Sequence, residues 1–194
     1  MELNNTYDIL KITNGYFRGY DPVEKTHGAA KSTGCTGSLS MEAETRTVVK
    51  RCEGEVVEER TIVTAYLVTL VGHLPVGVLR DIYGFTNEGL KPGVYAIGNK
   101  SKAKKGIYTW QAEDLYDEQK KYLAFPNMSV TSGYAFSHEN GAEEIAEVTI
   151  SFKAMKDDLG NFYYEAYEKE LTDETVKTGW AQTFDKTLIE LVTP

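Results

Sequence analysis

The clearest pattern in the chain is alternation of apolar and polar side chains with a period of two, which is typical of β-strands. From Cys35 onward, "GSLSMEAETRTVVKRCEGEVVEERTIVTAYLVTL" predicts two long strands with a tip near "CEGE". The second strand is apolar on both faces over residues 60–70 and is therefore expected in the middle of a sheet. Together these runs predict a β-hairpin that extends over residues 44–60.

The tip of this hairpin is strongly charged. Its first strand is basic and its second strand is acidic, and the charged residues are Arg46, Lys50, Arg51, Glu53, Glu55, Glu58 and Glu59. Opposite charges across antiparallel strands attract each other, but only weakly when water surrounds them. Two interpretations stay open: a hairpin that is simply solvated, and a charged extension that binds a second copy of the chain.

Residues 74–84 carry the one strong helix signal. Pro75 suits the first turn of a helix, and Gly84 suits its C-terminal end. The apolar residues recur at helical spacing and form one face; they are Leu74, Val78, Leu79, Ile82 and Tyr83. The pattern predicts one helix that flanks the sheet.

The two ends of the chain lack a clear period. Residues 1–33 contain scattered Gly, Pro and Asp and are interpreted as an N-terminal arm, with at most a short strand near residues 9–12. Residues 34–194 are expected to form one mainly β domain. Near the C-terminus, residues 169–177 are either a helical turn or a loop, and "KTLIELV" (residues 186–192) is β-like.

The segment "FSHENGAEEIAEV" (residues 136–148) holds one histidine and four glutamates, so it is a candidate metal or acid–base site. On both sides of it the apolar residues are even-numbered, so a hairpin here has to pair even residues with even residues. A three-residue loop over 139–141 achieves this and puts Gly141 where positive φ is needed. Glu143 and Glu147 then lie about 13 Å apart on one strand. His138 lies on the other face, which argues against a metal or acid–base site.

The same register predicts a small, polar and acidic strand face. Its candidate residues are Glu143, Glu147, Thr149 and Ser151. A face of this kind is found where a sheet meets solvent, and it would equally suit the wall of a water-filled channel. Both interpretations remain open at this point.

Composition narrows the function classes. The chain has 194 residues, of which 41% are hydrophobic and 26% charged, enough for one domain with a core. The net charge of −8 is opposite in sign to that of generic nucleic-acid-binding proteins. A basic loop is formed by Lys100, Lys102, Lys104 and Lys105. It lacks a Gly-rich phosphate cradle, so it is interpreted as a solvated loop or as a partner for the acidic hairpin of a neighbouring subunit.

The sequence shows no recognisable motif for catalysis, metal binding or membrane insertion. Cys35 and Cys52 lack zinc-binding spacing and are expected to be reduced thiols. We predict no catalytic residues, no metal ligands and no cofactor, and therefore no enzyme. The N-terminus does not read as a signal peptide, and the longest apolar run is too short to span a bilayer. We therefore expect synthesis in the cytoplasm and no membrane insertion.

Four segments, in this order, closely resemble the major tail protein, or tail tube protein, of tailed phages and prophages of Gram-positive bacteria. They are "GCTGSLSMEAETRTVVKRCEGEVVEERT", "LPVGVLRDIYGF", "GVYAIGNKS" and "LAFPNMSVTSGYAFSHENGAEEIAEVTISFKAMKDDLGNFYYEAY". The resemblance covers residues 33–194. It implies a β-sandwich with one flanking helix, a long hairpin extension and terminal arms.

The resemblance also implies a function. In that family, hexameric rings stack into a hollow tube that conducts DNA from the capsid to the host, without catalysis or a cofactor. By position, residues 44–60 correspond to the stacking hairpin and residues 74–84 to the flanking helix. An acidic lumen, with Glu143, Glu147, Thr149 and Ser151 on its wall, would repel phosphates and let DNA slide.

The resemblance further implies a location and partners. The chain would reside in the virion tail after assembly in the host cytoplasm. Its partners would be further copies of itself, tape measure and terminator proteins, and DNA in transient, non-specific passage. The alternative is a carbohydrate- or protein-binding β-sandwich module of a virion or cell surface, which predicts a concave aromatic patch and a stable monomer or trimer.

Overall fold

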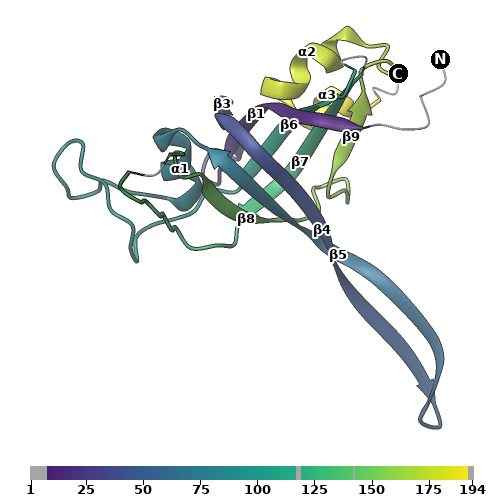
Figure 1. The fold of residues 1–194 in the computed structure, drawn as a ribbon. Helices are drawn as coiled ribbons and strands as arrows, with labels where there is room; N and C mark the ends of the chain where they lie inside the picture. Colours follow the sequence, from purple (N-terminus) through teal and green to yellow (C-terminus); the bar gives the residue numbers. More distant parts are fainter. Residues whose placement is uncertain (1–7, 117–118, 142, 192–194) are drawn as a thin grey trace.

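The computed structural model describes residues 8–116, 119–141 and 143–191 and shows a mainly β protein with a long projecting hairpin (Figure 1). The strands are β1 (Ile9–Asp21), β2 (Thr26–His27), β3 (Lys31–Ser32), β4 (Cys35–Cys52), β5 (Glu55–His73), β6 (Gly106–Asp114), β7 (Lys120–Val130), β8 (Val148–Ala154) and β9 (Tyr164–Tyr167). The helices are α1 (Val76–Tyr83), α2 (Glu174–Thr183) and α3 (Lys186–Ile189). The predicted mainly β class, with few helices, is confirmed.

The strands form one antiparallel sheet with the order β2-β1-β6-β7-β8-β5-β4. β3 pairs with β1, and β9 pairs with β7. β1 and β4 lie far apart in this order, yet they approach each other in space, so the sheet bends around a common core. A β-sandwich would divide these strands between two separate sheets. In the described residues, hydrogen bonds instead join them into one sheet.

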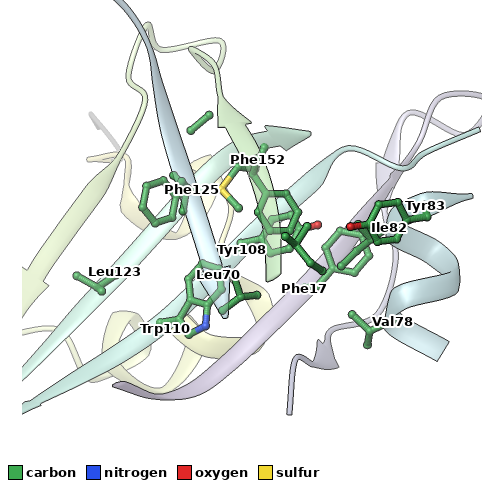
Figure 2. Close-up of a cluster of buried hydrophobic side chains, with 14 of the residues drawn as sticks. Phe17, Leu70, Val78, Ile82, Tyr83, Tyr108, Trp110, Leu123, Phe125 and Phe152 are labelled. Carbon is green, nitrogen blue, oxygen red and sulfur yellow. The ribbon is translucent and has the colours of Figure 1, made fainter. Parts of the chain in front are cut away.

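The core lies inside this bend and is rich in aromatic residues (Figure 2). Trp110 and Tyr108 of β6 stack with ring centroids 5.9 Å apart, and Phe152 of β8 lies 4.9 Å from Tyr108. Ile150, Phe152 and Ala154 of β8 are buried and Val148 is partly buried, as the alternation of even-numbered residues predicted. α1 closes one side of the core with Val78, Ile82 and Tyr83.

The N-terminal segment contributes more to the sheet than the sequence suggested. The short strand expected near residues 9–12 is a 13-residue strand, β1, that pairs with β6, and Phe17 is only 1% exposed. The glycines in this segment interrupt the strand pattern in the sequence, but in the structure they allow β1 to pack closely against its neighbours. A Cβ at Gly15 would lie 2.5 Å from Nε1 of Trp110, so only glycine lets β1 approach β6 this closely. Residues 1–7 of the predicted arm lie outside the described residues.

The hairpin predicted over residues 130–154 forms only at its base. Even residues do pair with even residues, but Val130 lies opposite Phe152, not opposite Ile150 as the predicted loop implies. Residues 131–141 and 143–147 lie outside the strands, and Gly141 has the expected positive φ of 80°. The predicted register is wrong, and Tyr134, which the prediction placed on the strand beside β8, instead packs edge-on against Tyr83 and Phe85, at 5.3 and 5.1 Å.

The helix predicted over residues 74–84 is confirmed as α1. Pro75 precedes its first residue, and Gly84 ends it in the left-handed conformation with φ of 69°. The β-like assignment of "KTLIELV" is wrong, because Asp185 caps a short helix there. Its Oδ1 accepts hydrogen bonds from the backbone N–H groups of Thr187 (2.9 Å) and Leu188 (3.2 Å). Of the two alternatives for residues 169–177, the helical one holds from Glu174.

Asp81 of α1 ties three parts of the fold together. Its carboxylate pairs with Lys31 of β3 and with Lys104, whose Nζ is 3.0 Å away. Burial opposes ionisation of Asp81, but the hydrogen bonds from Lys31 and Lys104 outweigh it and lower the pKa of the carboxyl below 3.8. The ionised carboxylate thus helps to hold β3 and the segment before β6 against α1.

We expect Asp81→Asn to lower the free energy of unfolding by about 1 kcal/mol at neutral pH, since both lysines are half exposed. A depressed carboxyl pKa contributes stability that is present above the unfolded-state pKa and lost as pH falls through the folded-state pKa. Denaturant unfolding at several pH values should therefore show the two proteins converging below pH 3.8. A constant difference between them down to about pH 2 would contradict this role.

Candidate assembly surfaces

The hairpin of β4 and β5 projects far beyond the body of the protein (Figure 1). Cys52 pairs with Glu55 at its end, and a two-residue turn, Glu53-Gly54, connects them. Both turn residues have positive φ, 52° and 90°, the conformation that matches the twist of a tight hairpin. The tip predicted near "CEGE" is confirmed.

Residues 45–61 of this hairpin are exposed on both faces. A two-stranded ribbon with neither face covered is at best marginally stable in water. Apolar side chains nevertheless lie along it; they are Val48, Val49, Val56 and Val57, each exposed by more than a third. A ribbon of this kind has unused apolar surface available for a partner.

The predicted charged residues lie on the two strands of the ribbon, with Glu53 in the turn. Lys50 is directly opposite Glu58, so one of the expected cross-strand charge pairs is in place. Arg46 instead faces Ile62, and Arg51 faces Val56 and donates a hydrogen bond to the carbonyl of the turn residue Gly54 (3.3 Å). Most of the charge on the ribbon is therefore directed to solvent rather than across the strands.

The four predicted channel residues are only partly brought together. Thr149 and Ser151 lie on the solvent side of β8, opposite Val71 and Thr69 of β5. Glu143 lies in the loop 131–147, exposed and off any strand. The single strand face that the sequence predicted is therefore not formed, because the loop diverges after Val130.

Glu147 stays close to this polar side of the sheet. Its carboxylate rests against Gly37 of β4, where an added Cβ would lie 2.3 Å from Oε1. The surrounding surface is mostly small and polar, interrupted by Leu67 and Val71 of β5; its polar residues include Ser38, Ser40, Thr69, Thr149 and Ser151. An ion pair between Lys153 and Glu44 (2.5 Å) neutralises part of its charge. The surface is thus polar and only modestly acidic.

A second exposed apolar region lies at the opposite end of the molecule, in the two loops beside α1 (Figure 1). Phe136 is 79% exposed and stacks only against Tyr134, at 6.5 Å. Arg80 of α1 lies 3.7 Å from the ring centroid of Tyr95 in the following loop and anchors that ring. Further exposed apolar residues in these loops are Leu90, Val94, Ile97 and Ile145.

A cleft of about 520 Å³ lies between the β1–β2 turn, the start of β6 and α3. Burial, helped by the charge of Arg18, lowers the pKa of His27 on its wall, so this imidazole is neutral at pH 7. Asp157 and Asp185 accept hydrogen bonds from backbone N–H groups of their own turns. These carboxylates therefore serve to shape the turns around the cleft.

Other candidate chemistry was checked against the same residues. Within the described ranges, no three His, Cys, Asp or Glu side chains gather as a metal ion would require. Cys35 and Cys52 are exposed thiols without a disulfide. Of the helices described, none is long and apolar enough to cross a lipid bilayer.

Comparison with known proteins found several solved structures of similar fold, among them the following two. One is described as the anti-feeding prophage cap (AFP tube terminating cap); it is 13% identical, the match covers 86% of this chain and 95% of that chain, and the TM-score is 0.47. The other is the PVC sheath-tube complex of an extracellular contractile injection system in its extended state; it is 14% identical, with coverages of 78% and 87% and a TM-score of 0.40.

No protein-family model matches the sequence. No curated protein matches it either. With both TM-scores below 0.5, the function has to be argued from the surfaces of this chain.

Sequence reasoning missed the apolar component of these surfaces. The pairs Val48-Val49 and Val56-Val57 interrupt the charged strands of the hairpin as "TVVK" and "EVVE". Two adjacent valines in a ribbon that is charged throughout place one apolar side chain on each face, and that signal was available. The loop aromatics could not be assigned, because Tyr134 and Phe136 fit the strand alternation equally well.

Proposed function

We propose that this chain is a structural subunit of a phage tail tube or of a related injection device, and that it acts by self-assembly rather than by catalysis. The observation that carries the proposal is the projecting hairpin. Residues 45–61 are exposed on both faces, bear valines and charges, and leave the body of the fold. The resemblance of residues 33–194 to tail tube proteins supports the same role.

The hairpin would join successive rings of the tube. Each ring would contain several subunits, six by analogy with the family, and the stacked rings would enclose a continuous lumen. Two exposed apolar regions at opposite ends of one molecule suit this arrangement, because contacts between unlike surfaces generate rings and filaments.

The polar side of β4, β5 and β8 is the surface that best suits the lumen. Thr149 and Ser151 would line it directly, with Glu147 beside them and Glu143 on the adjoining loop. Small polar side chains and carboxylates offer DNA few cationic contacts, and Lys153 on this side is paired with Glu44, so a strand would pass without binding. Tape measure and terminator proteins would be the other partners in the virion tail.

Negative-stain microscopy of the concentrated, purified protein tests the proposal directly. We expect rings or tubes of constant bore. A reconstruction of those tubes should place Thr149 and Ser151 on the bore and the hairpin between layers. A protein that stays monomeric at every concentration and salt condition tried would contradict the proposed function, while tubes with β8 on the outer surface would contradict the lumen assignment alone.

A further inference from the structure

The loop between α1 and β6 has a defined conformation with a recess at its surface. Thr86 and Ala96 form a two-way backbone bridge, with N···O distances of 3.0 and 2.9 Å. Beside this bridge lies a recess of about 410 Å³, whose lining includes Leu90, Ala96 and Ile97 together with Glu88 and Lys100. The loop thus presents an apolar depression at its surface.

The surroundings of the recess are basic. Residues 86–105 contain five lysines and one glutamate, a net charge of +4. Lys104 is engaged by Asp81 of α1, whereas Lys100 is 71% exposed and reaches only Glu88, at 3.8 Å. The recess is therefore apolar at its centre, with the exposed Lys100 at its rim and further lysines elsewhere in the same loop.

The tip of the hairpin has the complementary composition. Residues 50–59 read "KRCEGEVVEE", in which two valines lie between glutamates and the net charge is −2. Val57 lies in a bulge between the pairs Lys50–Glu58 and Arg51–Val56 and is 60% exposed. Because a bulge redirects its extra residue out of the regular ladder, Val57 projects from the ribbon.

The two surfaces cannot meet within one chain. The loop follows α1, which adjoins the His73 end of β5, whereas the tip lies at the other end of the same strand (Figure 1). At strand rise, the 19 residues of β5 separate the two ends by roughly 60 Å. Contact between the tip and the recess therefore requires two molecules.

We propose that the recess of the loop 86–105 is the docking site for the hairpin tip of a second copy of this chain. Val57 of one copy fills the recess beside Leu90 and Ile97 of the other, and the glutamates of the tip face Lys100 and the other lysines of the loop. This inference rests on the proposed function and names the receiving surface, which the hairpin alone does not identify.

The test is a charge exchange between tip and loop. One variant carries Glu55→Lys and Glu58→Lys, a second carries Lys100→Glu and Lys102→Glu, and a third carries all four substitutions and keeps the wild-type net charge. Each two-site variant disrupts two charge contacts. We expect this loss to raise the protein concentration needed for tube formation by at least about tenfold. The four-site variant should recover most of this loss, as should an equimolar mixture of the two two-site variants.

The matched control is Lys169→Glu with Lys186→Glu, the same charge change at two exposed lysines outside the loop. It should assemble like the wild type, and thermal unfolding should show that every variant is folded. Sedimentation and negative-stain microscopy give the readout. If wild-type protein forms no tubes, the proposed function fails; if wild-type tubes form but the loop variant assembles equally well, or the four-site variant does not recover, the docking site is wrong and the function stands.

Discussion

Removal of the projecting hairpin should abolish tube formation while leaving the subunit folded. Thr45 and Val63 lie directly opposite each other at its base, so they can be joined through the existing Glu53-Gly54 turn. The deleted residues are almost all exposed and none belongs to the hydrophobic core. The free energy of unfolding should therefore change by no more than about 1 kcal/mol, whereas assembly should fall below detection by sedimentation.

A full-length control separates loss of the hairpin from loss of its chemistry. Substitution of Arg46, Lys50 and Arg51 by Glu keeps the ribbon but reverses the charge of its basic strand. The attractive Lys50–Glu58 pair then becomes a pair of like charges. Although the tip becomes more acidic, glutamates directly opposite each other should repel, distort the ribbon and so block stacking, with thermal unfolding close to that of the wild type. Normal tubes from either protein would show that the hairpin is not the stacking element.

Trp110→Ala should cause the largest loss of stability. The indole is fully buried, stacks on Tyr108 and meets Phe125 edge-on at 6.1 Å. Truncation of a buried tryptophan costs about 3–5 kcal/mol, a large share of the roughly 5–15 kcal/mol that stabilises a typical domain. Urea unfolding followed by circular dichroism should show a lower midpoint with a similar slope.

The matched control for this prediction is Phe136→Ala, since Phe136 is an aromatic residue that is 79% exposed. Its removal should change the unfolding free energy by no more than about 0.5 kcal/mol. Equal losses from the two variants would mean that Trp110 is not part of a well-packed core.

The elements that the sequence predicted correctly have strong local determinants. α1 is bounded by Pro75 and Gly84, and the hairpin tip by a glycine turn between alternating strands. The end of the chain shows the reverse case: "KTLIELV" alternates like a strand, but the carboxylate of Asp185 caps two backbone N–H groups and makes it a helical turn. Reading Asp185 as a cap would have corrected that prediction.

The parts that failed depend on contacts between distant segments. Phe17 is buried because Gly15 lets β1 lie against Trp110, which is 95 positions further along the chain, and no local pattern encodes that approach. At the base of the predicted hairpin, even residues pair with even residues as expected. Tyr134 then packs against Tyr83 of α1 and does not pair with β8. For the candidate site, the charged hairpin was located correctly, whereas the channel residues were scattered by the loop 131–147.

The placement of the hairpin tip and the loop recess at opposite ends has a consequence for length. When a contact joins unlike ends of identical subunits, each added layer presents the same free surface that the previous layer presented. Growth by such a contact is directional and contains no internal stop. The number of layers in a tube built from this chain would then be fixed by a component that measures or blocks the growing end, and not by the subunit itself.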